Sequence, residues 1–301
     1  MLPLFVQTPK FRPVLPFISA AIFKTTFAFN RFFGGTRNAL TKQMLENLDI
    51  NLPPISEQIE IGRTLQVLDD KIANNTKINH HLEQMAQAVF KSWYVDFDPW
   101  GGTMPEGWRI EKLGNLCQSI SKTHSFSKNS LIFLNTGDIS NGRFLHNTYS
   151  TIKDMPGQAK KSISRNDILY SEIRPINRHF AYVNFDSPDY VVSTKLMVIR
   201  AKEIDSWRLY HYLTSKDIID ILQLEAEAES RSGTFPQIRF ENIQHLDILL
   251  ATSEVETQFS EKLNNIYANI EINNAESANL AAIRDTLLPR LMSGELSIAY
   301  M

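Results

Sequence analysis

The chain repeats one stretch of its own sequence, and this repeat limits the folds that are open to it. The segment GGTRNALTKQMLENLDINLPP (residues 34–54) aligns without a gap with SGTFPQIRFENIQHLDILLAT (residues 232–252), 198 positions further along. The copies share Gly-Thr near their starts and Leu-Asp-Ile near their ends, and most apolar positions stay apolar downstream. Such a repeat indicates a duplicated structural unit, so the sequence between the copies is expected to form the working part.

A long amphipathic helix is predicted after each copy of the repeat. The first runs from about residue 56 to 93 with no proline and one glycine, Gly62. Its apolar positions recur at alternating intervals of three and four residues, which is typical of a helix packed along another helix. At about 1.5 Å per residue such a helix is about 55 Å long. The predicted helix-pairing residues are Leu65, Leu68, Ile72, Asn75 and Leu82 in the first helix and Leu263, Ile266, Ile270, Asn273 and Leu280 in the second.

Asparagine occupies the same helix-pairing position in both copies, as Asn75 and Asn273. A buried Asn destabilises a helix pair but fixes its register and its choice of partner. Two unrelated surface helices are the alternative, but neither would then have a place to bury its apolar positions. We therefore expect a long antiparallel coiled coil, formed within one chain or with the same helices of a second chain.

The segment between the helices has the pattern of an α+β domain. Strands followed by turns are predicted over residues 130–140 and 167–175, further strands over 179–185 and 191–200, and a helix over 205–229 that breaks near Ser215 and Lys216. The N-terminal segment resembles only the end of this domain. The predicted domains are therefore a C-terminal remnant of a first unit (1–51), a first long helix (52–102), one complete α+β domain (103–251) and a second long helix (252–301).

Motifs of catalysis are missing from the sequence. There is no G-x-x-x-x-G-K-[ST] phosphate loop for ATP, and no Gly-rich S-adenosylmethionine-type loop followed by an N-P-P-Y-like tetrad. Asp189 and Glu203 could form a nuclease pair, but no lysine follows Glu203 at the required spacing, and ordinary surface acids are the favoured interpretation. The adjacent His80 and His81 would point apart on a helix, so they do not form a metal pair. The sequence predicts no catalytic residue, no cofactor and no metal.

The cellular compartment follows from two further features. The single cysteine, Cys117, excludes an internal disulfide and a cysteine-rich zinc site, which fits a reducing cytoplasm. No run of about 18 apolar residues is present, so no membrane span is expected. We expect a cytoplasmic protein with no membrane partner.

Positive charge is concentrated in part of the α+β domain, although the whole chain has a formal net charge of −2. Residues 143–178 contain seven Lys or Arg and three Asp or Glu, a local net charge of +4. A DNA-binding surface needs Lys and Arg for phosphates, and Arg, Lys, Asn or Gln for base edges; an ordinary solvated surface is the alternative. Together with the polar loop KTHSFSKNS (122–130) and the turn RPINRH (174–179), this segment supplies the candidate DNA-binding residues Lys122, Lys128, Arg143, Lys160, Lys161, Arg174, Asn177, Arg178 and His179.

The order of these motifs resembles the specificity subunit of type I restriction-modification systems. PEGWRIEKLG (105–114) opens the domain, NDILYSEIRP (166–175) lies in its middle and GTFPQI (233–238) near its end, and the repeat supplies GGTRNALTKQMLENLDINLPPISEQ (34–58). In that family two target-recognition domains alternate with two long spacer helices. A full-length relative carries two complete target domains, whereas this chain has one and about the last third of another.

The resemblance also implies a function and partners. The target-recognition domain would bind double-stranded DNA, and the helices would set the distance between two half-sites. Methyltransferase subunits would bind the helices, carry S-adenosylmethionine and methylate adenine, while a restriction subunit would use ATP and Mg²⁺. A homodimer or a complementing specificity fragment would supply the missing half. The alternative is a coiled-coil adaptor that binds protein through its α+β domain.

Overall fold

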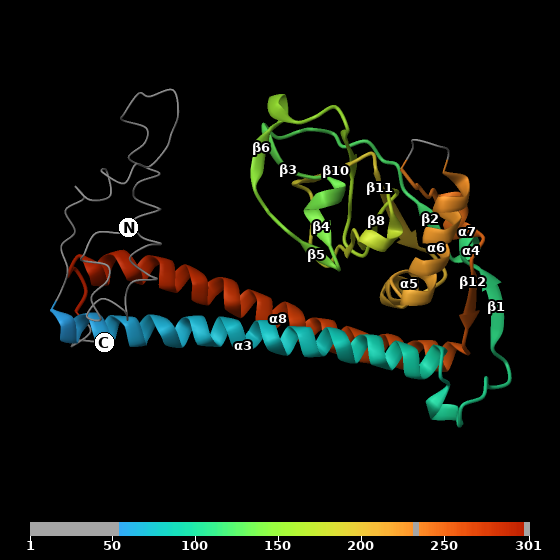
Figure 1. The fold of residues 1–301 in the computed structure, drawn as a ribbon, viewed down its shortest axis with the longest axis horizontal. Helices are drawn as coiled ribbons and strands as arrows, with labels where there is room; N and C mark the ends of the chain where they lie inside the picture. Colours follow the sequence, from blue (N-terminus) through green and yellow to red (C-terminus); the bar gives the residue numbers. More distant parts are fainter. Residues whose placement is uncertain (1–53, 231–234, 298–301) are drawn as a thin grey trace. The chain divides into compact units, whose positions relative to one another are not determined.

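The computed structural model describes residues 54–230 and 235–297, and it has an α+β fold (Figure 1). The chain divides into two compact units. Unit 1 comprises residues 1–83 and 267–301, and unit 2 comprises residues 84–266. The predicted domain remnant over residues 1–51 lies outside the described residues.

Helices α3 (Ile55–Tyr94) and α8 (Ser253–Met292) are each 40 residues long and contribute to both units. At about 1.5 Å per residue, each helix is about 60 Å in length. Helix α3 begins directly after Pro54, whose carbonyl accepts a hydrogen bond from Gln58 N at 3.0 Å. It extends one residue beyond the predicted range at each end, because nothing between Pro54 and Tyr94 interrupts the backbone hydrogen bonds.

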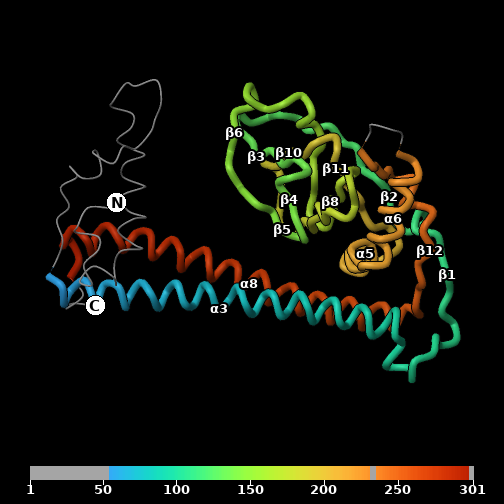
Figure 2. Tube along the Cα trace, viewed as in Figure 1, coloured from blue at the N-terminus to red at the C-terminus, as the bar shows by residue number. Residues whose placement is uncertain are grey.

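In unit 1 the two helices run antiparallel, side by side (Figure 2). Ile61 and Leu65 of α3 pack with Leu288 and Leu291 of α8 in one cluster whose members are at most 7% exposed. Fully burying a side chain of this size contributes about 1.5–3 kcal/mol. All ten predicted helix-pairing residues, in both units, are buried or half-buried.

Polar contacts replace apolar ones further along the helix pair of unit 1. Asn75 Nδ2 donates to Glu276 Oε2 at 2.7 Å and to Ser277 Oγ at 3.2 Å, and Asn273 Nδ2 donates to Asn79 Oδ1 at 2.8 Å. In the repeat, Asn75 corresponds to Asn273 and Asn79 to Ser277. The contacts Asn75–Ser277 and Asn79–Asn273 are therefore exchanged when the two copies are exchanged. The duplicated sequence builds a helix pair with internal two-fold pseudosymmetry.

Unit 2 contains two four-stranded sheets, with strand orders β6–β3–β10–β7 and β2–β11–β8–β9. The β3/β10 pair is parallel and the other pairs in these sheets are antiparallel. The first sheet consists of β3 (Ser130–Leu134), β6 (Tyr149–Thr151), β7 (Ala159–Ser162) and β10 (Tyr190–Ser193). The second consists of β2 (Cys117–Ser119), β8 (Ile168–Ser171), β9 (Phe180–Tyr182) and β11 (Leu196–Ala201).

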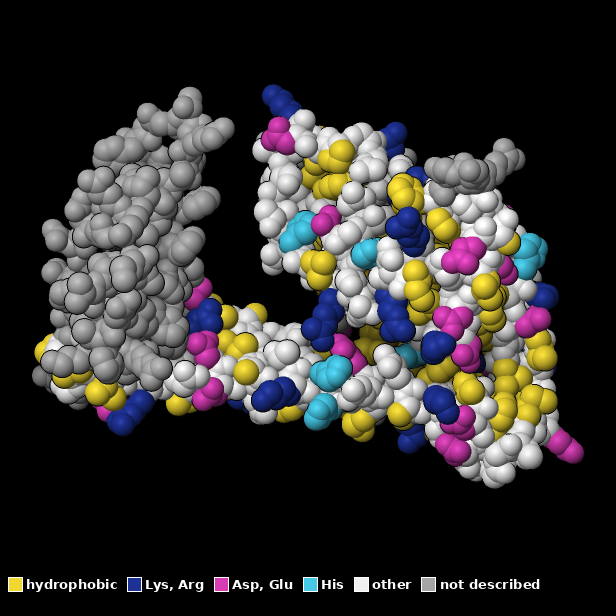
Figure 3. All heavy atoms as spheres, viewed as in Figure 1, with side chains coloured by type: hydrophobic (Ala, Val, Ile, Leu, Met, Phe, Trp, Pro, Cys, Tyr) yellow, Lys and Arg dark blue, Asp and Glu magenta, His cyan; other side chains and the backbone are white. Residues whose placement is uncertain are grey.

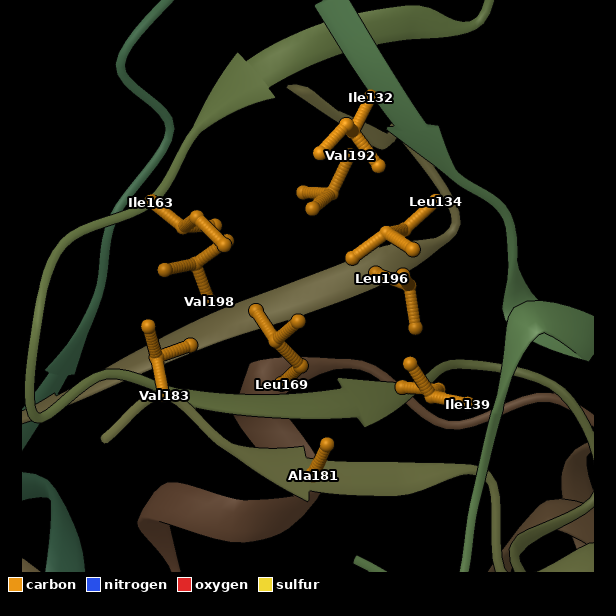
Figure 4. Packing of buried hydrophobic residues seen from close by; sticks show 10 residues of the cluster. All are labelled: Ile132, Leu134, Ile139, Ile163, Leu169, Ala181, Val183, Val192, Leu196 and Val198. Carbon is orange, nitrogen blue, oxygen red and sulfur yellow. The ribbon is translucent and has the colours of Figure 1, made fainter. Parts of the chain in front are cut away.

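The main hydrophobic core of unit 2 lies between these two sheets (Figure 4). Ile132 and Val192 enter it from the first sheet, and residues of β8, β9 and β11 enter it from the second. Their chain neighbours Leu131 and Val191 join a second cluster instead. This division follows from the alternation of side chains along a strand, which sends successive residues to opposite faces of the sheet.

The single strand predicted over residues 191–200 is wrong. Strand β10 ends at Ser193 and β11 begins at Leu196, in the other sheet. Between them Lys195 N donates to Ser193 Oγ at 3.2 Å, which closes a turn. A continuous run of strand-forming residues contains no periodic signal for such a turn.

The break predicted near Ser215 is confirmed, because α5 (Ser206–Leu213) ends before α6 (Lys216–Glu229) begins.

The two ends of the globular part of unit 2 meet in a two-stranded antiparallel sheet of β1 (Arg109–Lys112) and β12 (Asp247–Leu250). Helix α4 (Leu113–Leu116) follows β1, and α7 (Phe240–Gln244) precedes β12. These two helices approach closely at Gly114, where a Cβ atom would lie 2.9 Å from Gln244 Cβ. A larger residue at Gly114 would therefore force α4 and α7 apart.

Arg208 joins α5 to the parts of α3 and α8 that belong to unit 2. Its side chain is 1% exposed, and Nη2 donates to Leu249 O at 2.9 Å. The guanidinium carbon lies 3.5 Å from the centre of the Tyr94 ring and 4.9 Å from that of Phe90. Glu256 Oε2 lies 3.9 Å from Nε. A charge withdrawn from water needs such surroundings, because its desolvation costs several kcal/mol.

The asparagine contact between the helices of unit 1 predicts non-additive mutations. Asn79→Ala and Asn273→Ala should each lower the free energy of unfolding by about 1 kcal/mol, since each removes the hydrogen bond from Asn273 Nδ2 to Asn79 Oδ1. The double variant should lose less than the sum, by about 0.5–1.5 kcal/mol. Urea denaturation followed by far-UV circular dichroism measures this. A control pair, Asn79→Ala with the distant Thr286→Ala, should be additive; equal additivity in both pairs would contradict the contact.

His211 predicts a pH dependence of stability in unit 2. Burial, together with the nearby positive charge of Arg208, lowers the pKa of His211 to about 3. The unfolded chain binds this proton near pH 6.5, so the stabilising contribution is present above pH 6.5 and is lost as the pH falls, by about 1.4 kcal/mol per pH unit. Between pH 6.5 and 4.5 the wild type should lose about 2 kcal/mol more than His211→Phe.

Tryptophan fluorescence during urea denaturation reports on this unit alone, because all four tryptophans, Trp93, Trp100, Trp108 and Trp207, belong to it. The same pH dependence in the wild type and in His211→Phe would rule out His211 as the group responsible.

Candidate nucleic-acid interface

Two segments that are far apart in the sequence lie side by side on unit 2. Residues 172–174, at the end of the NDILYSEIRP motif, run antiparallel to residues 236–238 of the GTFPQI motif. Ile238 N donates to Glu172 O at 2.8 Å, and Arg174 N donates to Pro236 O at 3.1 Å. Gly233 and Thr234 of the second motif lie outside the described residues. The fold thus joins two of the sequence motifs into one surface.

An exposed turn follows this junction. It is a short 3-10 helix, η6 (Pro175–Asn177), and the side chains of Arg174, Asn177 and Arg178 on it are exposed. Within the described part of the chain, none of these three side chains has a hydrogen-bond partner. Arg174 instead lies over an aromatic ring, with its guanidinium carbon 4.6 Å from the centre of Phe235. The turn therefore presents donors and one acceptor to a ligand.

Arg143 is brought next to this turn. It lies on β5 (Arg143–Phe144), which forms a hairpin with β4 (Ile139–Ser140). Asn141 N, in the hairpin turn, donates to Arg178 O at 2.9 Å. Gly142 has a φ of 82° and a Cβ atom there would lie 2.6 Å from the Tyr210 hydroxyl, so the hairpin can approach this closely only with glycine.

His179 supports the turn and is not part of its exposed surface. It is half-buried, and its Nδ1 lies 2.7 Å from Ile139 O, to which it donates. Its backbone carbonyl accepts a hydrogen bond from Ser171 N at 2.9 Å. Both contacts tie the end of the turn to neighbouring strands.

Three of the four candidate lysines, Lys122, Lys160 and Lys161, form a second group around β7. His124 N donates to Lys160 O at 2.7 Å and Ser162 N donates to Lys122 O at 2.9 Å, so the loop before β3 lies against this strand. The side chains of Lys122 and Lys160 are exposed. Lys161 points inward: its Nζ donates to Thr194 O at 3.0 Å and to Leu196 O at 2.9 Å. Burial lowers the pKa of Lys161.

Lys128 is engaged by an acid. It forms an ion pair with Asp189, whose other carboxylate oxygen accepts a hydrogen bond from the Tyr149 hydroxyl at 2.7 Å. The hydrogen bond from Lys128, with a second from Tyr149, lowers the pKa of Asp189. The Asp189 carboxylate therefore links Lys128 and Tyr149 at the edge of the first sheet, and both of its oxygens are used in these contacts.

The sequence alone does not single out Phe235 or Lys195. Phe235 is 61% exposed beneath the Arg174 guanidinium. Lys195 Nζ lies 3.4 Å from Glu172 Oε2 and 3.3 Å from Gln237 Oε1, so it adds a positive charge beside the junction of the two motifs. Lys195 lies outside the basic segment 143–178, so the local charge does not mark it. The one sequence signal for Phe235 is its place in the motif GTFPQI.

The surface charges are mixed on the face of unit 2 seen in Figure 3. Lys and Arg side chains lie among Asp and Glu side chains and exposed hydrophobic side chains there.

Over the described ranges, no group of three or more His, Cys, Asp or Glu side chains could hold a metal ion. None of the described helices is long and apolar enough to cross a membrane.

Sequence comparison places the chain among known proteins. It matches the profile of the family described as "Type I restriction modification DNA specificity domain" over residues 14–84 and 105–282. It is 38% identical over 183 residues to the HindI type I restriction enzyme specificity subunit of Haemophilus influenzae, covering 60% of this chain and 39% of that protein. It is 22% identical over 283 residues to the MjaIX specificity subunit of Methanocaldococcus jannaschii, covering 88% of this chain and 64% of that protein.

The fold is also similar to that of a solved structure. The crystal structure of the type I restriction-modification system S subunit from M. genitalium matches with a TM-score of 0.51 at 17% identity, over 86% of this chain and 67% of that one. This likeness supports the α+β fold with long helices. The chain spans less than two thirds of the length of both curated relatives described above.

Two neighbouring lysines predict opposite outcomes on mutation. Lys161→Met should lower the free energy of unfolding by about 1–3 kcal/mol, because it leaves two carbonyls of the β10–β11 connection without a donor. Lys160→Met should change it by less than about 0.5 kcal/mol, as is usual for an exposed side chain. Urea denaturation followed by tryptophan fluorescence measures both. Equal destabilisation by the two changes would show that the inward position of Lys161 is wrong.

Proposed function

Because the chain belongs to the family of type I restriction-modification DNA specificity domains, we propose that it is a specificity subunit whose unit 2 binds double-stranded DNA. The observation that carries this proposal is the exposed turn at the junction of the two motifs. There Arg174, Asn177 and Arg178 have no hydrogen-bond partner among the described residues. Side chains whose hydrogen-bond donors are unused within the described residues suit a ligand with many hydrogen-bond acceptors.

Double-stranded DNA has the chemistry that these side chains require. Guanidinium groups donate to phosphate oxygens, and an amide can both donate to a base edge and accept from it. The hairpin that carries Arg143 and the exposed Lys122 and Lys160 add positive charge on the same unit. In this proposal residues 103–251 form the target-recognition domain. Loops on a rigid two-sheet scaffold are well suited to recognition, since the scaffold holds them in place.

The long helices act in this proposal as spacers, over residues 52–102 and 252–301. They would set the distance between half-sites and bind the methyltransferase subunits, which carry S-adenosylmethionine. The restriction subunit would bring ATP and Mg²⁺, so this chain would direct the chemistry of its partners and perform none itself. A second copy of the chain or a complementing specificity fragment would supply the other target-recognition domain.

DNA binding by unit 2 predicts a steep dependence on salt. For the complex of the chain with its methyltransferase subunits, the logarithm of the association constant should fall linearly with the logarithm of salt concentration, because each phosphate contact releases counterions. Arg174→Gln and Arg178→Gln should each reduce the magnitude of the slope by about one. Fluorescence anisotropy with a labelled duplex measures the slope.

Arg63→Gln is the matched control, since Arg63 is an exposed arginine on α3 in unit 1, paired with Glu60. Its slope should equal that of the wild type. Binding that is insensitive to salt, or absent with both proteins folded, would instead favour an adaptor that binds protein.

A further inference from the structure

The turn between β8 and β9 is held in a strained conformation. Arg174 precedes η6 with a φ of 46° and Arg178 follows it with a φ of 55°. Both angles lie in the left-handed region, which non-glycine residues adopt uncommonly. Such strain costs about 1–3 kcal/mol for each residue and persists only where the surroundings impose it, often at functional sites.

The surroundings of the turn impose its conformation from several sides. Pro175 is buried at its base, and Ile176 N donates to the side-chain Oε1 of Gln223 on α6 at 3.2 Å. His179 closes the far end against Ile139 O. The backbone of the turn is therefore fixed before any ligand arrives, which reduces the entropy lost on binding.

Two side chains of different chemistry stand next to each other on this fixed turn. Ile176 is 51% exposed, although it is a large apolar residue. Asn177 is exposed and its amide has no hydrogen-bond partner within the described ranges. An isoleucine cannot donate to a phosphate, so its position between cationic residues indicates that the tip faces base edges.

We propose that the tip of this turn reads one A·T base pair in the major groove. Asn177 contacts the adenine, Ile176 contacts the methyl group of the thymine, and Arg174 and Arg178 hold neighbouring phosphates. This inference rests on the proposed function of unit 2, and it assigns separate roles to the residues of the turn.

The chemistry of both tip residues selects the same base pair. In the major groove adenine presents an acceptor, N7, beside a donor, the N6 amino group, and an asparagine amide complements both at once. Guanine presents two acceptors and would leave the asparagine oxygen unpaired. Thymine alone carries a methyl group, which is the contact that an apolar side chain can make.

The arginines suit phosphates better than bases. The Arg174 guanidinium carbon lies 4.6 Å from the centre of the Phe235 ring. This cation–π contact with the ring needs none of the guanidinium N–H groups as hydrogen-bond donors, so they stay available for an anion. Arg178 is exposed with no hydrogen-bond partner among the described residues and is long enough to reach the backbone while the shorter Asn177 meets a base.

The test begins with the recognised motif. The complex of the full chain with its methyltransferase subunits is expressed in cells, the methylated motif is mapped, and duplexes carrying it are made. At each A·T pair, adenine is replaced by 7-deazaadenine, which lacks N7, or thymine by deoxyuridine, which lacks the methyl group. Affinity of the complex is then measured for the wild type, Asn177→Ala and Ile176→Ala.

At one A·T pair, both replacements should weaken binding of the wild type, by roughly tenfold for 7-deazaadenine and by about fourfold for deoxyuridine. Asn177→Ala should lose the response to 7-deazaadenine and Ile176→Ala the response to deoxyuridine. Leu224→Ala, which truncates another exposed apolar residue of unit 2, is the control and should keep both responses. Arg174→Gln and Arg178→Gln should weaken binding equally on all duplexes.

The outcomes separate this inference from the function on which it rests. The complex could bind its motif specifically while Asn177→Ala and Ile176→Ala still respond to the base replacements at every A·T pair. That result would overturn the inference and leave the specificity role standing. A change of preference in Arg178→Gln, at a G·C pair, would overturn it in favour of base reading by arginine. Absence of specific DNA binding by the folded wild-type complex would overturn both. Unchanged urea denaturation confirms that each variant is folded.

Discussion

Arg208 carries a positive charge into the interior of unit 2, and the groups that surround this charge come from three parts of the chain. Tyr94 and Phe90 belong to α3, Leu249 belongs to β12 and Glu256 belongs to α8. Removal of any one partner would leave a desolvated charge less well compensated, which costs far more than a lost surface contact. The charge therefore ties α5 to the helix ends within unit 2, and α5 in turn stacks on β9 through Trp207 and Tyr182 at 3.6 Å between ring centres.

This arrangement matters for the proposed DNA recognition because β9 directly follows the turn that carries Arg174, Asn177 and Arg178. A turn can discriminate between bases only if its side chains are held within a fraction of an ångström of their productive positions. The stack of α5 on β9, the buried Pro175 and the ladder with residues 236–238 all restrain it. The strained backbone conformations of Arg174 and Arg178 persist because these contacts hold the turn in place.

The helix pair of unit 1 follows a different physical rule. Apolar contacts such as Ile61 with Leu288 provide stability but allow the helices to slide. The amides of Asn75, Asn79 and Asn273 find partners in one register only, so they trade some stability for a unique alignment. Because the copies are exchanged by the pseudosymmetry, a single duplicated sequence specifies both halves of this alignment.

The repeat, the two long helices, the α+β class and the break between α5 and α6 could all be predicted from the sequence, because each depends on local periodicity or on local breakers such as proline. The division of residues 191–200 between two sheets could not, since a turn closed by Ser193 leaves no periodic trace. Composition marked Lys160 and Lys161 alike, and only the tertiary structure turned one outward and the other toward the carbonyls of Thr194 and Leu196. The same holds for Phe235 beneath Arg174: charge and polarity are properties of a residue, but partners far away in the sequence are chosen by the fold.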